Sequence, residues 1–207
     1  RVTLLEARGK RPRPHLDDKI ITAWNGLMIS GLARSAAALG EPDHLTLATQ
    51  AAQFIYDHLC SQPGRSLSRS WRDGTASGKA FAMDYAFLIH GLLDLYQAGF
   101  EVKWLRWAAQ LQEEMDTLFL DKEKGGYYTV HTDMPNAVLR IKEDYDGAEP
   151  SPNSMAALNL ARLSTILGNA AWRTEAGRIF HLFGTTLDKS ASAVPAMVTA
   201  LDFFHRG

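Results

Sequence analysis

The sequence predicts an all-α fold, an arc of helical hairpins that forms part of an α/α toroid. Three observations predict this class. Apolar residues recur at helical spacing in seven segments, short turns join the first six segments into pairs, and the pairs recur along the chain. A barrel of six pairs needs nearly twice the 207 residues of this chain, so we expect missing parts of the same barrel on either side.

The first pair is predicted over residues 24–39 and 43–59, joined by a turn at 40–43. Its first helix is marked by a stripe at 3.6-residue spacing: Trp24, Leu27, Met28, Gly31, Leu32 and Leu39. Residues 1–20 ahead of it contain a short basic, proline-containing run that is typical of a solvated connector. We therefore expect an N-terminal connector, followed by helical hairpins of a single domain over residues 21–207.

The second pair is predicted over residues 83–99 and 102–119, and the third over 152–168 and 171–187. In the second pair an apolar register is kept by Trp104, Ala108, Leu111, Met115 and Leu118. A seventh helix is expected to start near Pro195, because proline is tolerated in the first turn of a helix.

The connections between the pairs are long, at residues 60–82 and 120–151, and contain strand-like patches. Residues 66–74 alternate in polarity and end in an Asp-Gly turn signal. Residues 125–132 and 138–142 alternate in the same way. We expect short β-hairpins in both connections, and long loops with their own structure are usually functional.

A polar residue recurs at the start of the first helix of each pair. Glycines that we expect to end these helices in the left-handed conformation are Gly40, Gly99 and Gly168. Fifteen positions before them stand Asn25, Asp84 and Asn153. We expect the three helices to be roughly parallel neighbours, with these side chains and the long loops at one end. Helix N-termini there offer free N–H groups and the positive end of the helix dipole to a ligand.

Three carboxylates at this end are candidates for acid/base chemistry: Asp84, Asp146 and Glu149. A glycosidase needs two, about 5–5.5 Å apart for retention or about 6.5–9.5 Å apart for inversion. The alternative is structural, because Asp is a favoured helix cap and Asp146-Gly147 is an ordinary turn pair. The sequence does not decide between these interpretations.

Nine further residues are candidates for holding a substrate: His15, Asp17, Asp18, Trp24, Asn25, Arg69, Trp71, Tyr85 and Asn153. The aromatic rings could stack on the apolar face of a sugar, and the guanidinium could hold a carboxylate or phosphate. Core packing is the alternative for the aromatic residues, and a salt bridge that fixes the loop is the alternative for the acids. His90 should face away from Asp84, since six residues turn a helix by about 240° beyond one full turn.

Composition excludes several classes of function. The net charge is −1, so we expect neither nucleic acid nor a membrane as partner. Cys60 is the single cysteine, so the chain has no disulfide, zinc quartet or redox pair of its own. HExxH, P-loop and GxGxxG motifs are absent, and we expect no metal, no cofactor and a cytoplasmic location.

Five motifs make the chain resemble the spermatogenesis-associated protein 20 family. RPRPHLDDK, AWNGLMISGLA, DYAFLIHGLLDLYQA, GGYY and DGAEPSPNSMAALNLARL follow one another in the family's order. The resemblance implies the middle-to-late part of a six-hairpin, glycosidase-like α/α barrel, and a thioredoxin-like domain elsewhere in the full-length protein. Met83 departs from the family, which usually has an acidic residue just before DYAF. This departure weakens a paired-carboxylate role for Asp84.

The resemblance leaves two functions open. Barrels of this superfamily include glycoside hydrolases and N-acylglucosamine 2-epimerases, so the first is a sugar-binding pocket with acid/base carboxylates. The second is a noncatalytic barrel that binds a partner or supports the thioredoxin-like domain. Fold similarity alone does not decide whether the chain is catalytic.

Overall fold

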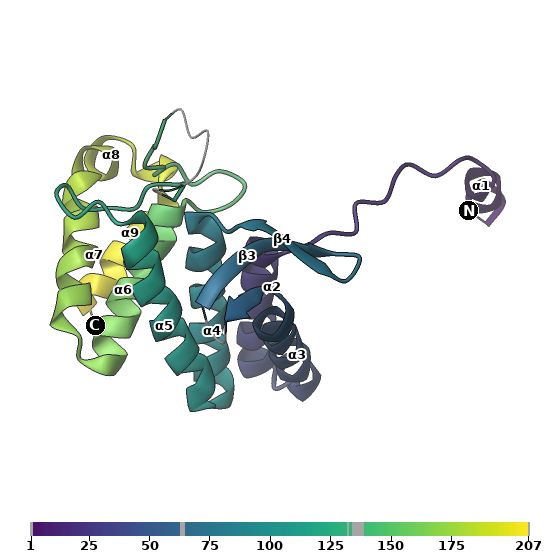
Figure 1. The fold of residues 1–207 in the computed structure, drawn as a ribbon, viewed down its shortest axis with the longest axis horizontal. Helices are drawn as coiled ribbons and strands as arrows, with labels where there is room; N and C mark the ends of the chain where they lie inside the picture. The colour runs from purple at the N-terminus through teal and green to yellow at the C-terminus, as the bar shows by residue number, and fades with distance from the viewer. Residues whose placement is uncertain (1, 63–64, 132, 134–138, 207) are drawn as a thin grey trace.

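The computed structural model describes residues 2–62, 65–131, 133 and 139–206. The predicted fold class is confirmed. Helical hairpins stand side by side, and a small β-sheet and long loops lie at one end of the helices (Figure 1). Within the described residues, no helix is both long and apolar enough to cross a membrane.

The helices agree with the predicted segments along most of their length. The first two hairpins comprise α2 (Thr22–Leu39), α3 (Pro42–His58), α4 (Ala82–Gly99) and α5 (Val102–Phe119). The rest of the helical body comprises α6 (Pro152–Leu167), α7 (Ala170–Leu182), α8 (Gly184–Lys189), a 3-10 turn (Ala191–Ala193) and α9 (Pro195–Arg206). The single helix predicted over 171–187 is wrong in its second half. The chain breaks at Phe183, before Gly184 and two threonines, which are weak helix formers.

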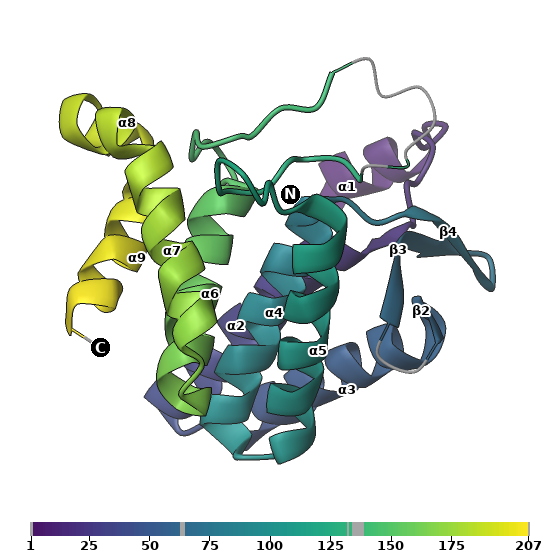
Figure 2. The same ribbon diagram turned by 60° about the vertical axis from the view of Figure 1, so that its left-hand side comes forward.

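Helices α2 and α4 are parallel neighbours, as predicted. The Ala23 N–H donates to Asp84 near the start of both helices, and the Ser30 hydroxyl donates to Asp94 further along both, at 2.6 Å. The register therefore advances in the same direction on the two helices. Figure 2 shows α2, α4 and α5 packed side by side.

Two glycines allow α2 and α4 to approach closely. A Cβ atom built on Gly91 would lie 2.4 Å from the Gly26 carbonyl oxygen, and one built on Gly26 would lie 2.5 Å from the Phe87 carbonyl carbon. No real Cβ makes contacts this short, so only glycine fits at the crossing. The two backbones touch there, and α4 is buried along nearly all of its first four turns.

Helix α6 packs on the other side of α4 in the same direction. The Asn159 side chain donates to the Ala86 carbonyl at 2.8 Å. Arg162 bonds to Asp94 at 2.6 Å and contacts the His90 ring at 3.2 Å. These contacts make α2, α4 and α6 one layer of parallel helices, with α3, α5 and α7 paired to them on the outside.

The first long connection forms the β-hairpin that was predicted there, and this hairpin belongs to a four-stranded sheet that also includes a strand from before α2. The strands of the sheet are β1 (Ile20–Ile21), β2 (Cys60–Gln62), β3 (Arg65–Arg72) and β4 (Thr75–Lys79), with β3 pairing antiparallel to the other three. Asp73 and Gly74 join β3 to β4, and both have positive φ, 49° and 79°. This is the backbone that an Asp-Gly hairpin turn requires.

The strand predicted in the second connection is wrong for the residues that the structure describes. Gly125 and Gly126 both have positive φ, 76° and 73°, which prevents an extended strand. One isolated bridge joins Leu120 to Tyr127, and the Thr129 N–H donates to the Ile141 carbonyl. Most of the turn between the two patches, including residues 134–137, lies outside the described residues.

One of the three predicted helix-ending glycines is also wrong. Gly40 and Gly168 have φ of 71° and 69°, as expected. Gly99 instead lies inside α4, and Phe100 takes the left-handed conformation with φ 55°. The Phe100 N–H donates to Tyr96 at 2.7 Å, and the two rings pack edge to face. These contacts offset the steric cost of about 1–2 kcal/mol that a non-glycine residue meets there.

The N-terminal connector runs away from the helical body (Figure 1). It begins with helix α1 (Val2–Gly9), in which every residue is exposed. This helix was not predicted from the sequence. The connector reaches the body at β1, which pairs with β3.

Candidate functional site

Asp84 lies at the N-terminal end of α4, fully buried, and joins two helices. One carboxylate oxygen accepts from the Ala23 N–H of α2 at 3.1 Å, and the other accepts from the Phe81 N–H at 2.8 Å. Both donors belong to helix starts, whose N–H groups lack partners within their own helices. Asp84 is thus a capping residue for two helices at once, rather than the simple N-cap of one.

Burial raises the pKa of Asp84, because the charged form loses its hydration. The Phe81 N–H, Arg69 and the Ala23 N–H lower the pKa again, and the negative charge of Glu149 raises it. The closest approach of Arg69 to the carboxylate is 3.4 Å. Every oxygen of Asp84 therefore already has a donor, which favours a structural role.

Glu149 is the candidate carboxylate with bonding capacity to spare. Its Oε1 accepts from the Trp24 indole N–H at 3.2 Å. Its Oε2 is buried and, among the described residues, has no hydrogen-bond donor. An unpaired buried carboxylate oxygen costs free energy, which a ligand hydroxyl or a proton can recover. Trp24 is 57% exposed, so much of the side chain that bonds to this carboxylate is open to solvent.

Asp146 is engaged with the backbone. One oxygen accepts from the Ser151 N–H at 2.7 Å, and the other accepts from the Ala196 N–H at 2.8 Å in the first turn of α9. Asp146 therefore caps a helix 50 residues further along the chain. These contacts favour a structural role for Asp146.

Asn25 and Asn153 lie at the predicted end but do not meet. The Asn25 amide donates to the Ile21 carbonyl in its own first turn. Asn153 is buried, accepts from the Tyr127 N–H at 2.7 Å and donates to the Tyr127 and Glu143 carbonyls. Asn153 thereby holds the second long connection against α6.

Of the candidates around β3, only Arg69 lies near the carboxylates. Its guanidinium stacks on Phe81 at 4.4 Å and contacts Asp84. Trp71 packs against Phe54 and His58, so its ring holds β3 against the outer helix α3. Tyr85 is buried in the core.

The predicted residues of the connector lie apart from this cluster. His15 and the Asp17 side chain are exposed, and Asp17 pairs with Lys19 at 3.3 Å. Asp18 pairs with Arg72 of β3 at 2.7 Å. The carboxylates therefore make the salt bridges that were the expected alternative to a pocket role.

Sequence reasoning missed a small cavity of about 180 Å³ beside the start of α4. Its lining comprises Phe81, Met83, Thr129, Val130, Glu143 and Pro152. Met83 contributes an apolar wall at the position where the resemblance implies an acid. Helical periodicity could have placed Met83, but no sequence signal brings residues 129–143 to it.

His90 faces away from Asp84, as predicted, and belongs to a buried network. Its ring lies 3.4 Å from Asp94 and 3.2 Å from Arg162. Burial lowers the pKa of His90 to about 4, so the ring is neutral near pH 7. Among the described residues, no cluster of His, Cys, Asp and Glu side chains is arranged to hold a metal ion.

Comparison with known sequences places these features in context. No protein-family model matches the chain. Human spermatogenesis-associated protein 20 is 40% identical over 207 residues, which cover 96% of this chain and 26% of that protein. The chain is similar to one segment of spermatogenesis-associated protein 20 from human and mouse. An uncharacterised Caenorhabditis elegans protein is 36% identical over 99% of the chain and 28% of its own length. The chain thus spans about a quarter of the length of these relatives.

Solved structures share the fold of this segment. Cellobiose 2-epimerase from Bacillus thermoamylovorans superposes with a TM-score of 0.74 at 13% identity, covering 93% of this chain and 58% of the enzyme. A GH76 α-mannanase from Bacteroides thetaiotaomicron gives 0.71 at 11% identity, covering 93% and 55%. At these identities the likeness establishes the six-hairpin α/α barrel fold, and this chain is a segment of such a barrel.

Proposed function

We propose that the barrel containing this segment binds a carbohydrate at the end where α2, α4 and α6 begin, with Glu149 as its acid/base residue. The Glu149–Trp24 pair carries the proposal. It combines a buried carboxylate oxygen that lacks a donor among the described residues with an exposed indole beside it. Sugars offer hydroxyl donors for the first and an apolar ring face for the second.

Two further observations support the proposal. The names of structurally similar proteins, cellobiose 2-epimerase, α-mannanase and D-mannose isomerase, all refer to sugars. Arg69, at the rim of the same cluster, is a donor that could hold a ring hydroxyl or a sugar carboxylate.

The contacts favour a reaction that uses one mobile proton carrier over one that uses two. Asp84 and Asp146 already accept two backbone N–H groups each. Glu149 can take or give a proton at Oε2, and its bond to Trp24 fixes the orientation of the carboxylate. An epimerase-like or isomerase-like proton transfer therefore fits this segment better than two-carboxylate glycoside hydrolysis.

The test measures the thermal shift of the full-length protein with each of a panel of mono- and disaccharides. Turnover is then measured with the sugar that binds. With the sugar that binds, Glu149→Gln should reduce turnover about 10²–10⁴-fold while the melting temperature stays the same. Trp24→Ala should weaken binding. The control, Glu41→Gln, changes an exposed carboxylate at the far end of α2. Full turnover in Glu149→Gln would refute the acid/base role.

A noncatalytic barrel is the second candidate. It is favoured by the use of Asp84 and Asp146 as helix caps, which leaves a single carboxylate for chemistry. In this case the barrel would support the thioredoxin-like domain that the resemblance implies. No sugar in the panel would then shift the melting temperature, and deleting the barrel would destabilise that domain.

A further inference from the structure

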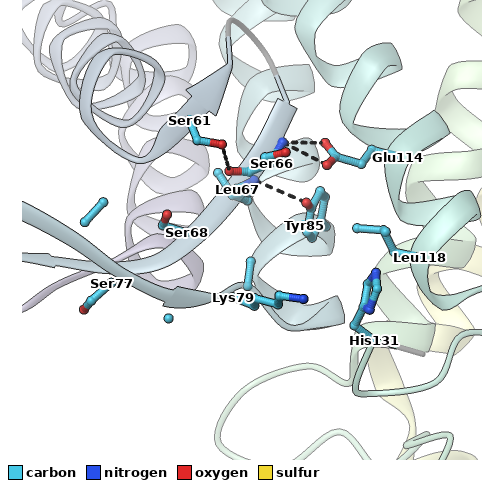
Figure 3. A pocket seen from close by; sticks show the side chains of 13 residues that line it. Ser61, Ser66, Leu67, Ser68, Ser77, Lys79, Tyr85, Glu114, Leu118 and His131 are labelled. Atoms are coloured by element: carbon cyan, nitrogen blue, oxygen red, sulfur yellow. Dashed lines mark hydrogen bonds between the residues drawn. The ribbon is translucent and has the colours of Figure 1, made fainter. Parts of the chain in front are cut away.

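A second cavity of the described residues lies outside the carboxylate cluster, between the sheet and α5. Its volume is about 460 Å³, within the range of about 300–1,000 Å³ typical of small-molecule sites. Figure 3 shows its walls: Ser66 and Ser68 from β3, Lys79 from β4, Glu114 from α5 and His131 from the second long connection. The hydroxyl of Tyr85 closes one side, where it accepts from the Leu67 N–H at 3.3 Å.

One side of this cavity presents a cation and a donor. Lys79 is exposed, directs its ammonium toward the side where Tyr85 and His131 lie (Figure 3), and makes no ion pair with any described residue. The His131 Nδ1 accepts from the Asp133 N–H at 2.8 Å, so the neutral ring carries its proton on Nε2. An ammonium and an imidazole N–H together suit an oxyanion.

The other side presents hydroxyls and a carboxylate that is already engaged. Both oxygens of Glu114 accept from the Ser66 N–H, at 2.8 and 3.1 Å. This contact stabilises the carboxylate and leaves lone pairs to accept from ligand hydroxyls. The Ser68 hydroxyl stands beside Lys79, because these residues are register partners across β3 and β4. The cavity is also larger than a bare inorganic anion.

We propose that this cavity binds a small polyol that carries one oxyanion. Lys79 and His131 hold the anion, and Ser66, Ser68 and Glu114 hold the hydroxyls. The oxyanion is a phosphate ester or a carboxylate, which share this chemistry. The cavity shares no lining residue with the Glu149–Trp24 pair, so the two sites can be tested separately.

The test is isothermal titration calorimetry of the full-length protein with four probes: glucose 6-phosphate, glucuronate, glucose and inorganic phosphate. At least one of the first two should bind more tightly than both glucose and phosphate, and whichever binds identifies the oxyanion. Loss of one charge-assisted hydrogen bond in Lys79→Gln should weaken this binding about tenfold or more. The matched control, Lys189→Gln, removes an exposed ammonium at the end of α8 and should leave binding unchanged.

Two further variants distinguish a failure of this proposal from misfolding and from a failure of the proposed function. Ser68→Ala should weaken the polyol probes and leave inorganic phosphate unaffected. Glu149→Gln should leave all four affinities unchanged, whether or not it abolishes a sugar-directed activity. Absence of binding by both anionic polyols, an affinity no higher than that of inorganic phosphate for the anionic polyol that does bind, or equal effects of the two lysine substitutions would overturn the site.

Discussion

The carboxylate of Asp84 accepts one backbone N–H from the start of each of two helices. Replacing it with an amide therefore has a different effect on stability here than at an ordinary N-cap. Asparagine matches aspartate as an N-cap, so the sequence alone predicts that Asp84→Asn leaves the fold nearly intact. In the structure each oxygen accepts an N–H, from Ala23 and from Phe81. An amide has one oxygen, so its NH₂ group would face a second donor.

We therefore expect Asp84→Asn to lower the free energy of unfolding by about 1–3 kcal/mol, the cost of leaving a buried donor unpaired. Urea denaturation measures this loss. The control, Asp43→Asn, changes an exposed acid in the first turn of α3 and should cost much less. Equal stability of Asp84→Asn and the wild type would show that the two N–H groups are satisfied in another way.

His90 gives the molecule a specific dependence on pH. Burial lowers the pKa of His90 from 6.5 to about 4, so the unfolded chain binds this proton at higher pH than the folded chain. The contribution to stability is complete above pH 6.5 and is lost as the pH falls toward 4. When the pH is lowered from about 7.5 to about 4.5, the free energy of unfolding should therefore fall less in His90→Gln than in the wild type. Parallel curves of unfolding free energy against pH would contradict this assignment.

At the scale of elements, the α2–α4 crossing depends on the absence of two Cβ atoms. Gly91→Ala would place a methyl group 2.4 Å from the Gly26 carbonyl oxygen, so the helices must separate. We expect a loss of about 1–3 kcal/mol or more in unfolding free energy. Gly31→Ala is the matched control, because a Cβ atom on this residue of α2 would meet no other described element within 4 Å. That change should be neutral or stabilise by up to about 1 kcal/mol.

The elements differ in how far the sequence could predict them. The helices followed from local periodicity, and the β3–β4 hairpin followed from one Asp-Gly pair. The left-handed Phe100 did not, because its ring contact with Tyr96 outweighs the preference for glycine. The partners of Asp84 and Asp146 lie 61 and 50 residues away along the chain, at Ala23 and at the start of α9. Sequence reasoning brought these acids to one end but could not tell which were already occupied.

At the scale of the whole molecule, α2 leaves an apolar face uncovered. Met28 is 60% exposed and Leu39 is 69% exposed, and both fall on one side of the helix. The relatives are about four times longer than this chain, and the segment covers 58% of the similar epimerase. We propose that a further hairpin of the same barrel covers this face in the full-length protein.

A charged substitution on this face should destabilise the full-length protein, in which the face is covered, more than the isolated chain, in which the face is exposed. In the full-length protein Met28→Glu should cost about 3 kcal/mol or more, because a buried charge loses its hydration. In the isolated chain the same change should cost little. The control, Leu47→Glu, alters an exposed leucine of the outer helix α3 and should cost little in both. Urea titrations of both proteins measure the difference, and equal losses for Met28→Glu would refute the covered face.

The bond from Ala23 to Asp84 also sets an order of events during synthesis. The acceptor for this helix start is made 61 residues after the donor, which takes a ribosome about 3–12 s. During that interval α2 has neither its cap nor the glycine surface of α4 against which it packs. The first hairpin therefore leaves the exit tunnel incomplete, and it becomes a stable unit only when the second hairpin follows. A ribosome that pauses between residues 40 and 84 would prolong the exposure of α2 to chaperones and proteases.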